Sequence, residues 1–149
     1  MAAAAHPQAF PFSGPHTDIP TLHTRYKWLE LLDAAQAYSE AQGYWILPYS
    51  PQTIDQRWAE LCGLYANGGL PMVSHIAVST LRYIQIHPDR NDYVILIKCG
   101  PSEDEARCTE VLEGVLNIFP VENHHHGDLL YYKNNSGKVT WNYPCPMNG

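Results

Sequence analysis

The sequence has no long apolar run: none of its stretches approaches the ~18 consecutive apolar residues that a bilayer-spanning helix requires. Its start, Met-Ala-Ala-Ala-Ala-His, has no basic segment followed by an apolar stretch, which is the form of a signal peptide. Together these absences predict a protein that does not enter the membrane, and a cytoplasmic location is the simplest expectation.

Charged residues are scarce, at 16% of the chain against about 25% in an average protein. Nine Lys and Arg residues stand against fifteen Asp and Glu residues, which gives a net charge of −6. Non-specific binding to a nucleic-acid backbone needs a basic stripe, so the acidic balance argues against it. A single nucleotide held in a local basic pocket is still compatible with this charge.

Several chemical signatures are missing. The sequence contains no GxxxxGK[ST], GxGxxG, GxSxG or HExxH motif. Its cysteines show neither CxxC pairing nor metal-type spacing, and without a signal peptide they are expected to be free thiols. They are Cys62, Cys99, Cys108 and Cys145. We therefore predict no cofactor and no metal, and the sequence does not by itself name a reaction.

The composition that is present suits one folded domain. Apolar residues make up 45% of 149 residues, enough for a hydrophobic core at this length. Residues 1–24 carry four prolines and predict a flexible arm, which could also dock on a protein partner. Residues 25–144 are expected to form a single domain, and 145–149 a short tail.

Apolar periodicity predicts three helices. Trp28, Leu31, Leu32 and Ala35 form a first helical stripe, which Gly43 would end. Ser50-Pro51 predicts the start of a second helix, and Ser102 with Glu105 predicts a capping box at the start of a third. The apolar stripes of these two helices are Ile54, Trp58, Leu61, Cys62 and Tyr65, and Cys108, Val111, Leu112, Val115 and Phe119.

Strand patterns alternate with these helices. Residues 44–47 predict a strand ended by Pro48, 72–80 a half-buried strand, 83–86 a short partner strand and 93–97 a central strand that is apolar on both faces. Residues 129–133 and 139–143 flank Asn134-Asn135-Ser136-Gly137 as a hairpin. The order predicts an α+β fold, with a curved mixed or antiparallel sheet backed by about three helices.

Several short segments also resemble one protein family. They are Gly-Tyr-Trp-Ile-Leu at 43–47, Ile-Asp at 54–55 with Trp58, Gly-Gly-Leu at 68–70, Ile-Ala-Val-Ser-Thr at 76–80, Val-Ile-Leu-Ile at 94–97 and Leu-Leu-Tyr-Tyr-Lys at 129–133. In this order they resemble the basophilic-leukaemia-expressed protein family over about residues 43–133. The resemblance implies a fold similar to the cap-binding translation initiation factor 4E. That family is sometimes labelled phosphothreonine-lyase-like, and such lyases use a histidine acid, a lysine base and arginines on the phosphate.

Four tryptophans and ten tyrosines supply flat rings that can stack on a nucleotide base. Trp28 and Trp58 fall on apolar helical stripes and are expected in the core. The first functional hypothesis is a non-enzymatic module that binds a nucleotide-like or short RNA ligand on an aromatic sheet face. The rings expected to stack are Trp141, Tyr131 and Trp45, and the cations expected on phosphate are Lys98, Arg82 and Lys133.

Histidine supplies the second hypothesis, an enzyme that acts on a phosphorylated or otherwise anionic substrate with a histidine general acid or base. The candidates are His75, which lies in the middle of a strand, and His124 and His126 of the His124-His125-His126 run. Adjacent histidines in an extended segment diverge, so this run does not by itself predict a metal site. A third hypothesis is a protein-interaction adaptor that uses residues 1–24.

Overall fold

The computed structural model describes residues 13–32, 42–70, 72–90, 92–120, 129–134 and 136–144. Within these residues seven strands form one open sheet in the order β1-β2-β4-β5-β3-β6-β7. The first pair is parallel and the other neighbours are antiparallel, so the sheet is mixed. The strands are β1 Gly14–Pro15, β2 Trp28–Leu32, β3 Gly43–Tyr49, β4 His75–Ser79, β5 Tyr93–Cys99, β6 Leu129–Lys133 and β7 Val139–Pro144.

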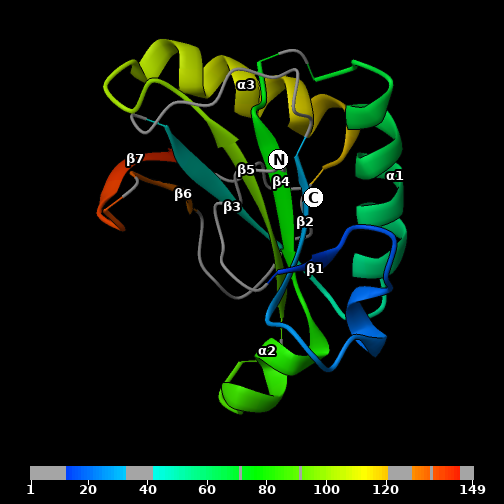
Figure 1. Cartoon of the computed structure of the whole chain (residues 1–149). Coiled ribbons are helices and arrows are strands. Elements are labelled where there is room, and N and C mark those ends of the chain that lie inside the picture. The colour runs from blue at the N-terminus through cyan, green and yellow to red at the C-terminus, as the bar shows by residue number, and fades with distance from the viewer. Residues whose placement is uncertain are drawn as a thin grey trace, which may run out of the picture.

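Three α-helices accompany this sheet in the described chain: α1 Ile54–Ala66, α2 Leu81–Ile86 and α3 Glu105–Ile118, with a short 3₁₀ helix η2 at Pro20–Leu22. The predicted stripes of α1 and α3 are buried in one core with alternate residues of β3. In Figure 1, α3 lies at one end of the sheet and α2 at the other. The sheet and its helices confirm the predicted α+β class.

The region 28–32 is a strand, so the helix predicted from its apolar stripe is wrong. Its five residues pair with the whole of β4, from Trp28 opposite Ser79 to Leu32 opposite His75. Leu29 is fully buried in the core. The apolar spacing fits both periods, and the pairing partner almost fifty residues later selects the strand.

The region 83–86 is helical, so the short strand predicted there is also wrong. Thr80 ends the strand before it and caps α2, because its hydroxyl accepts the Tyr83 backbone N–H at 3.3 Å. Side-chain capping at the first turn stabilises a helix. The preceding strand β4 is buried at all five positions rather than on one face only.

Other expectations differ in their boundaries. The strand predicted at 44–47 continues through Pro48 to Tyr49. Proline has no backbone N–H to donate, but β6 pairs only with residues 44–46, so no strand on that side requires a hydrogen bond from Pro48. The helix α1 begins at Ile54 after Thr53, and α3 is capped by Asp104. The predicted central position of β5 in the sheet is confirmed, and so is the predicted hairpin, which β6 and β7 form.

Residues 13–24 are part of the folded body, which corrects the arm predicted for 1–24. Strand β1 pairs with β2, and the Trp58 indole N–H donates to the His16 carbonyl at 2.9 Å. Thr21 donates through its backbone N–H to Asp55 at 3.0 Å. Residues 1–12 and 145–149 lie outside the described residues.

Two further observations concern the described part of the chain. None of its helices has the length and apolar character needed to cross a bilayer. Cys62, Cys99 and Cys108 are buried free thiols, as predicted, while Cys145 lies outside the described residues.

Candidate anion-binding surface

The strand register places the predicted ligand residues on two different faces of the sheet. His75 pairs with Lys98, Lys98 with Tyr44, and Tyr44 with Lys133, so these four side chains share the face that α1 and α3 do not cover. Tyr131 lies on the same face, in the next row, and is 39% exposed. The register therefore brings together Lys98, Lys133, Tyr131 and His75.

Trp45 and Trp141 lie on the other face, beneath the helices, which corrects their expected role as exposed stacking rings. Trp45 is fully buried, and its indole N–H donates to the Cys108 carbonyl of α3 at 2.8 Å. Trp141 is half-buried against the core and donates to the Ser102 carbonyl at 3.0 Å. Trp45 has no ring surface for a ligand, and Trp141 packs beside the start of α3.

A cluster of three ionisable side chains, Glu30, His75 and Lys98, is buried on the face of the sheet that α1 and α3 do not cover. The His75 Nε2 atom lies 3.4 Å from Glu30 Oε2, with side chains 2% and 5% exposed. Burial, together with the nearby Lys98 ammonium, lowers the pKa of His75 to about 4. Burial also lowers the pKa of Lys98, and the Glu30 carboxylate partly offsets that effect. His75 is therefore neutral at pH 7 and cannot donate as an imidazolium acid there.

The buried state of His75 predicts how stability depends on pH. The folded pKa of about 4 lies below the ordinary 6.5, so between these values the unfolded chain binds more protons. The free energy of unfolding should therefore fall as pH is lowered from about 6.5 to 4, by on the order of 3 kcal/mol from this residue. Urea unfolding across this range should show a shallower fall for His75→Asn, with His87→Asn as control. Equal pH dependence in the wild type and His75→Asn would contradict the assignment.

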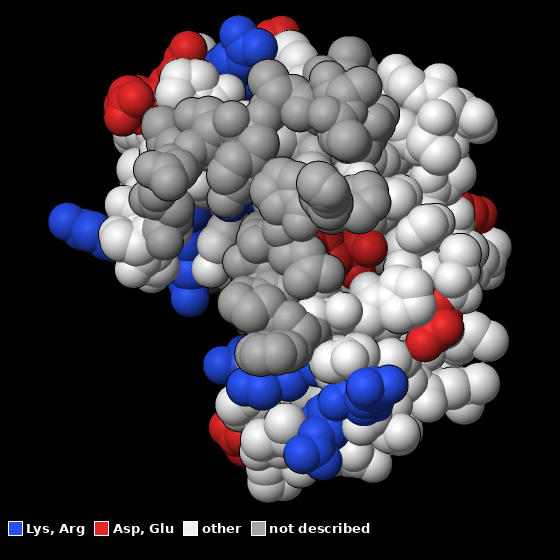
Figure 2. All heavy atoms as spheres, in the orientation of Figure 1, with Lys and Arg blue, Asp and Glu red and all other residues white. Residues whose placement is uncertain are grey.

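Arg82 stands apart from these residues, at the end of the sheet where α2 lies. Three more cations gather there on segments that are joined by backbone hydrogen bonds. These four exposed residues, the basic end, are Arg25, Lys27, Arg82 and Arg90. They are four of the nine Lys and Arg residues of the chain. Figure 2 shows blue side chains gathered at the end of the molecule where Figure 1 places α2.

Thr80 joins the two segments that carry the basic end. Its backbone N–H donates to the Lys27 carbonyl at 3.1 Å, and its hydroxyl donates to the Tyr26 carbonyl. The same hydroxyl caps α2, and the Arg82 backbone N–H donates to the His23 carbonyl at 3.1 Å. One buried threonine thus holds residues 25–27 against the first turn of α2.

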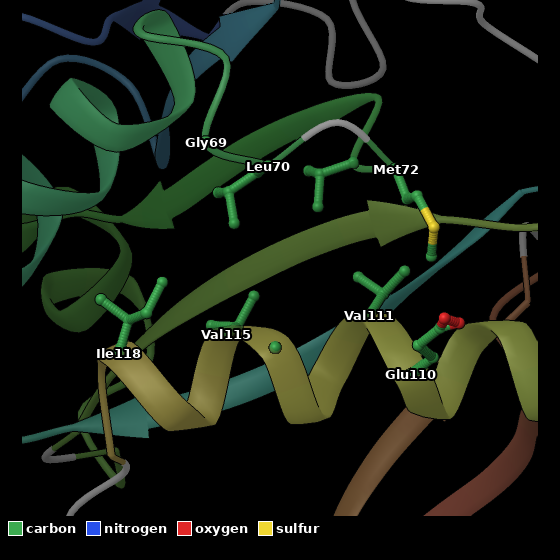
Figure 3. Close-up of a pocket in the computed structure, with 9 residues that line it drawn as sticks. Gly69, Leu70, Met72, Glu110, Val111, Val115 and Ile118 are labelled. Atoms are coloured by element: carbon green, nitrogen blue, oxygen red, sulfur yellow. The ribbon is translucent and has the colours of Figure 1, made fainter.

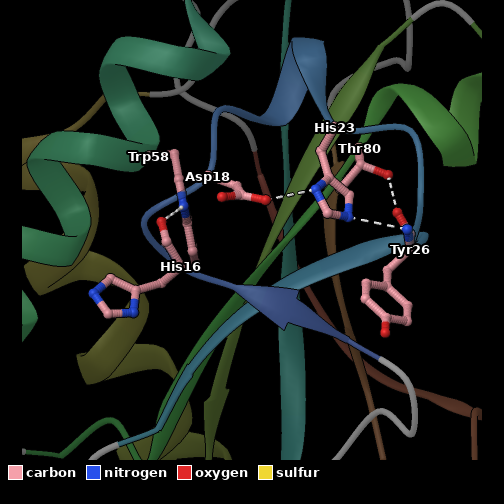
Figure 4. Close-up of polar contacts among 6 residues, drawn as sticks. All are labelled: His16, Asp18, His23, Tyr26, Trp58 and Thr80. Carbon is pink, nitrogen blue, oxygen red and sulfur yellow. Dashed lines mark hydrogen bonds and ion pairs between the residues drawn. The ribbon is translucent and has the colours of Figure 1, made fainter.

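His23 shapes the loop before Arg25 (Figure 4). Its Nε2 atom accepts the Tyr26 backbone N–H at 3.0 Å, and its Nδ1 atom lies 2.8 Å from Asp18 Oδ2. Because Nε2 is an acceptor, the ring proton is on Nδ1 and donates to Asp18. The imidazole therefore bridges the turn at residue 18 and the backbone at residue 26.

Aromatic rings lie between the cations of the basic end. The half-buried Trp28 and Tyr83 rings are 5.3 Å apart, and Tyr83 is 4.4 Å from the His87 ring. The Arg25 guanidinium lies 5.0 Å from the centre of the Tyr26 ring. Alternating cations and rings is the arrangement with which proteins hold single-stranded nucleic acid.

The positive charge of the basic end is not neutralised within the described chain. None of its four cations has a described carboxylate within 4.0 Å. The exposed Asp89 and Asp18 lie on neighbouring segments and moderate the field without pairing to it. A protein with a net charge of −6 thus presents one locally basic surface, which favours an anionic ligand.

A hollow of about 330 Å³ lies away from the basic end, between α3 and the segment around Leu70 (Figure 3). Leu70 and Met72 face Val111 and Val115 across it, and Glu110 stands at one end. None of the described residues that line it is a cation, so this hollow does not favour an anion.

The sequence contains a signal for the basic end that the sequence analysis did not use. Residues 25–28 read Arg-Tyr-Lys-Trp and residues 82–83 read Arg-Tyr, two short alternations of cation and ring. His124 and His126 lie outside the described residues. Among the described side chains, no three His, Cys, Asp or Glu groups converge as a metal-ligand set.

Comparison with known proteins adds no relative from which to transfer a function. No known protein family matches the chain, and no curated protein sequence matches it either.

Proposed function

We propose that the protein is a binding module for a nucleotide-like or short RNA ligand, which it holds at the basic end. The observation that carries this proposal is the group of four exposed cations that have no carboxylate partner among the described residues and are interleaved with half-buried aromatic rings. The guanidinium groups of Arg25 and Arg82 suit bidentate contacts to phosphate oxygens. Both Trp28 and Tyr83 are half-buried rather than fully buried, so bases of a flexible strand can stack on the part of each ring that is exposed.

The charge distribution favours a short ligand over a long one. The basic end contributes four positive charges, whereas the rest of the chain carries five Lys and Arg residues against fifteen Asp and Glu residues. A long polyanion that extended past the basic end would meet this acidic surface and be repelled. Affinity should therefore stop rising once the ligand covers the basic end.

Of the three cations expected on phosphate, this proposal retains only Arg82. It places the site at the end of the sheet where α2 lies. Lys98 is buried beside Glu30, and Lys133 lies on β6, five strands away from β1 in the sheet order. Trp28 and Tyr83 replace Trp45 and Trp141 as stacking rings. Membership of the basophilic-leukaemia-expressed protein family, the initiation factor 4E-like topology and a cytoplasmic location belong to the same proposal.

The proposal is tested by titrating a short, end-labelled single-stranded RNA and following its fluorescence anisotropy at several salt concentrations. Each phosphate contact on a single strand contributes about 0.7 to the slope of log affinity against log salt, so four cations predict a slope no steeper than about −3. Intrinsic tryptophan fluorescence should fall as well, and less so in Trp28→Phe. Absence of binding at low salt, or binding whose affinity does not change with salt, would overturn the proposal.

A further inference from the structure

A second feature adjoins the basic end: a hollow of about 550 Å³ formed by the segment from Thr17 to Arg25. Arg25 belongs both to this hollow and to the basic end. The His23 carbonyl, at the back of the same segment, accepts the Arg82 backbone N–H. A ligand with phosphate on Arg25 and Arg82 therefore has this hollow directly beside it.

The polar lining of the hollow comes from several residues, among them Asp18, His23 and Arg25, and the Asp18 carboxylate is the one that can accept a hydrogen bond from a hydroxyl. Oδ2 accepts from the His23 ring at 2.8 Å, which fixes the direction of the side chain (Figure 4). No described group donates to Oδ1, and the side chain is 45% exposed. A carboxylate oxygen held in place but left without a donor is suited to accept a hydrogen bond from a ligand hydroxyl.

The apolar part of the hollow is formed by Ile19 and Leu22, which are 49% and 69% exposed. Leu22 is the most exposed large hydrophobic residue of the described chain. Both belong to the η2 turn, in which the Leu22 N–H donates to the Ile19 carbonyl at 3.0 Å. Two branched aliphatic side chains on one turn give a flat ring an apolar surface to cover.

We infer that this hollow takes a terminal ribonucleoside whose 5′-phosphate reaches the basic end. The ribose hydroxyls donate to Asp18 Oδ1, the base covers Ile19 and Leu22, and the phosphate meets Arg25. Carboxylates recognise ribose hydroxyls in other nucleotide sites, and the 2′-hydroxyl distinguishes RNA from DNA. The inference rests on the proposed function and adds that the ligand carries a free 2′,3′-diol.

A free diol next to a 5′-phosphate occurs in two sources, a ribonucleoside 5′-monophosphate and the 3′ end of an RNA strand. The hollow recognises the chemistry that both share. The other three cations of the basic end contact only the longer ligand, so RNA should bind more tightly than the mononucleotide. Both ligands should lose affinity when the diol is removed.

The test uses two short RNAs that differ only at the last nucleotide, which carries either ribose or 2′-deoxyribose. We expect the wild-type protein to bind the all-ribose strand roughly tenfold more tightly, the value of one hydrogen bond to a charged group. Asp18→Asn should lose most of this preference, because its amide oxygen still accepts from His23 while a neutral NH₂ group, which cannot accept from the hydroxyl, replaces the charged Oδ1. Adenosine and 2′-deoxyadenosine 5′-monophosphate provide the same comparison for the mononucleotide.

Asp89→Asn is the matched control, because it removes one exposed carboxylate on the turn after α2, outside the hollow. It should leave the preference for the ribose end unchanged. Equal wild-type affinity for the two strands would overturn the inference and leave the proposed function standing. An unchanged ribose preference in Asp18→Asn would also overturn it. Absence of binding to either strand would overturn both.

Discussion

Reversing the charge of Arg82 and Arg90 to Glu should lower the affinity for short single-stranded RNA by at least about a hundredfold. Each arginine is exposed and has no described carboxylate partner, so each is available to a phosphate. A hydrogen bond to a charged group contributes about 1.5 kcal/mol or more, which is roughly tenfold in affinity, and reversal adds repulsion to that loss.

The two substitutions should leave the fold unchanged. Both side chains are exposed, and exposed surface substitutions usually alter the free energy of unfolding by about 0.5 kcal/mol or less. Arg82 lies in the first turn of α2, where a glutamate interacts favourably with the helix dipole. The loss of binding is therefore measurable in a folded protein, and urea unfolding of the variant checks this directly.

Lys133→Glu with Lys138→Glu is the matched control. It makes the same change in net charge, but at the β6–β7 hairpin rather than at the basic end. We expect a small loss in affinity, because only long-range attraction changes. The slope of log affinity against log salt should become shallower by about 1.4 for the arginine pair, since two contacts of about 0.7 each are lost. Similar losses for both pairs would mean that net charge alone governs binding.

Local apolar periodicity was sufficient to predict two helices and the central strand. The apolar residues of α1 and α3 recur at helical spacing, and those of β5 form a short continuous run. Each of these patterns fits only one kind of element. Residues 28–32 are different: Trp-Leu-Glu-Leu-Leu fits a helical stripe and a strand buried on both faces equally well. Its partner β4 lies almost fifty residues later, and no local pattern contains that information.

The candidate site was predictable only in part, for the same reason. Arg82 was among the cations expected on phosphate, but Arg25 and Lys27 were not, because they come close to Arg82 only through hydrogen bonds of Thr80 and Arg82 to residues 23–27. Trp45 was proposed as a stacking ring although the sequence does not assign it to a face of its strand, because the face to which an odd or even position points depends on where the helices pack. In the structure Trp45 is buried and contacts Cys108 of α3, so its position points to the face that the helices cover.

The two faces of the sheet are stabilised in different ways. One face is apolar and packs beneath α1 and α3. The other contains Glu30, His75 and Lys98, which are all buried and occupy neighbouring strands. With His75 neutral, the cluster holds one negative and one positive charge, and the Ser13 hydroxyl donates to Glu30 Oε1 at 3.0 Å. The charges of this face therefore depend on one another, and removal of either one should be costly.

Glu30→Gln should lower the free energy of unfolding by roughly 3 kcal/mol or more, because it leaves the Lys98 ammonium buried without its counter-charge. Lys98→Met should cost less. In that variant Glu30 remains 3.4 Å from His75, and loss of the Lys98 charge removes one of the two causes that lower the pKa of His75. The pKa of His75 should therefore rise in Lys98→Met, although burial still lowers it, and the imidazole takes up a proton at a higher pH than in the wild type.

Urea unfolding at pH 7 measures both costs, and the chemical shifts of the His75 ring protons followed against pH measure its pKa in Lys98→Met. Glu60→Gln is the control for Glu30→Gln, because the Glu60–Arg57 pair at 3.1 Å is partly exposed and such pairs contribute about 1 kcal/mol or less. The double variant Glu30→Gln with Lys98→Met removes both charges together, so it should be more stable than Glu30→Gln alone. If the double variant loses the sum of the two single costs, the two charges do not compensate each other and the cluster is not an interdependent unit.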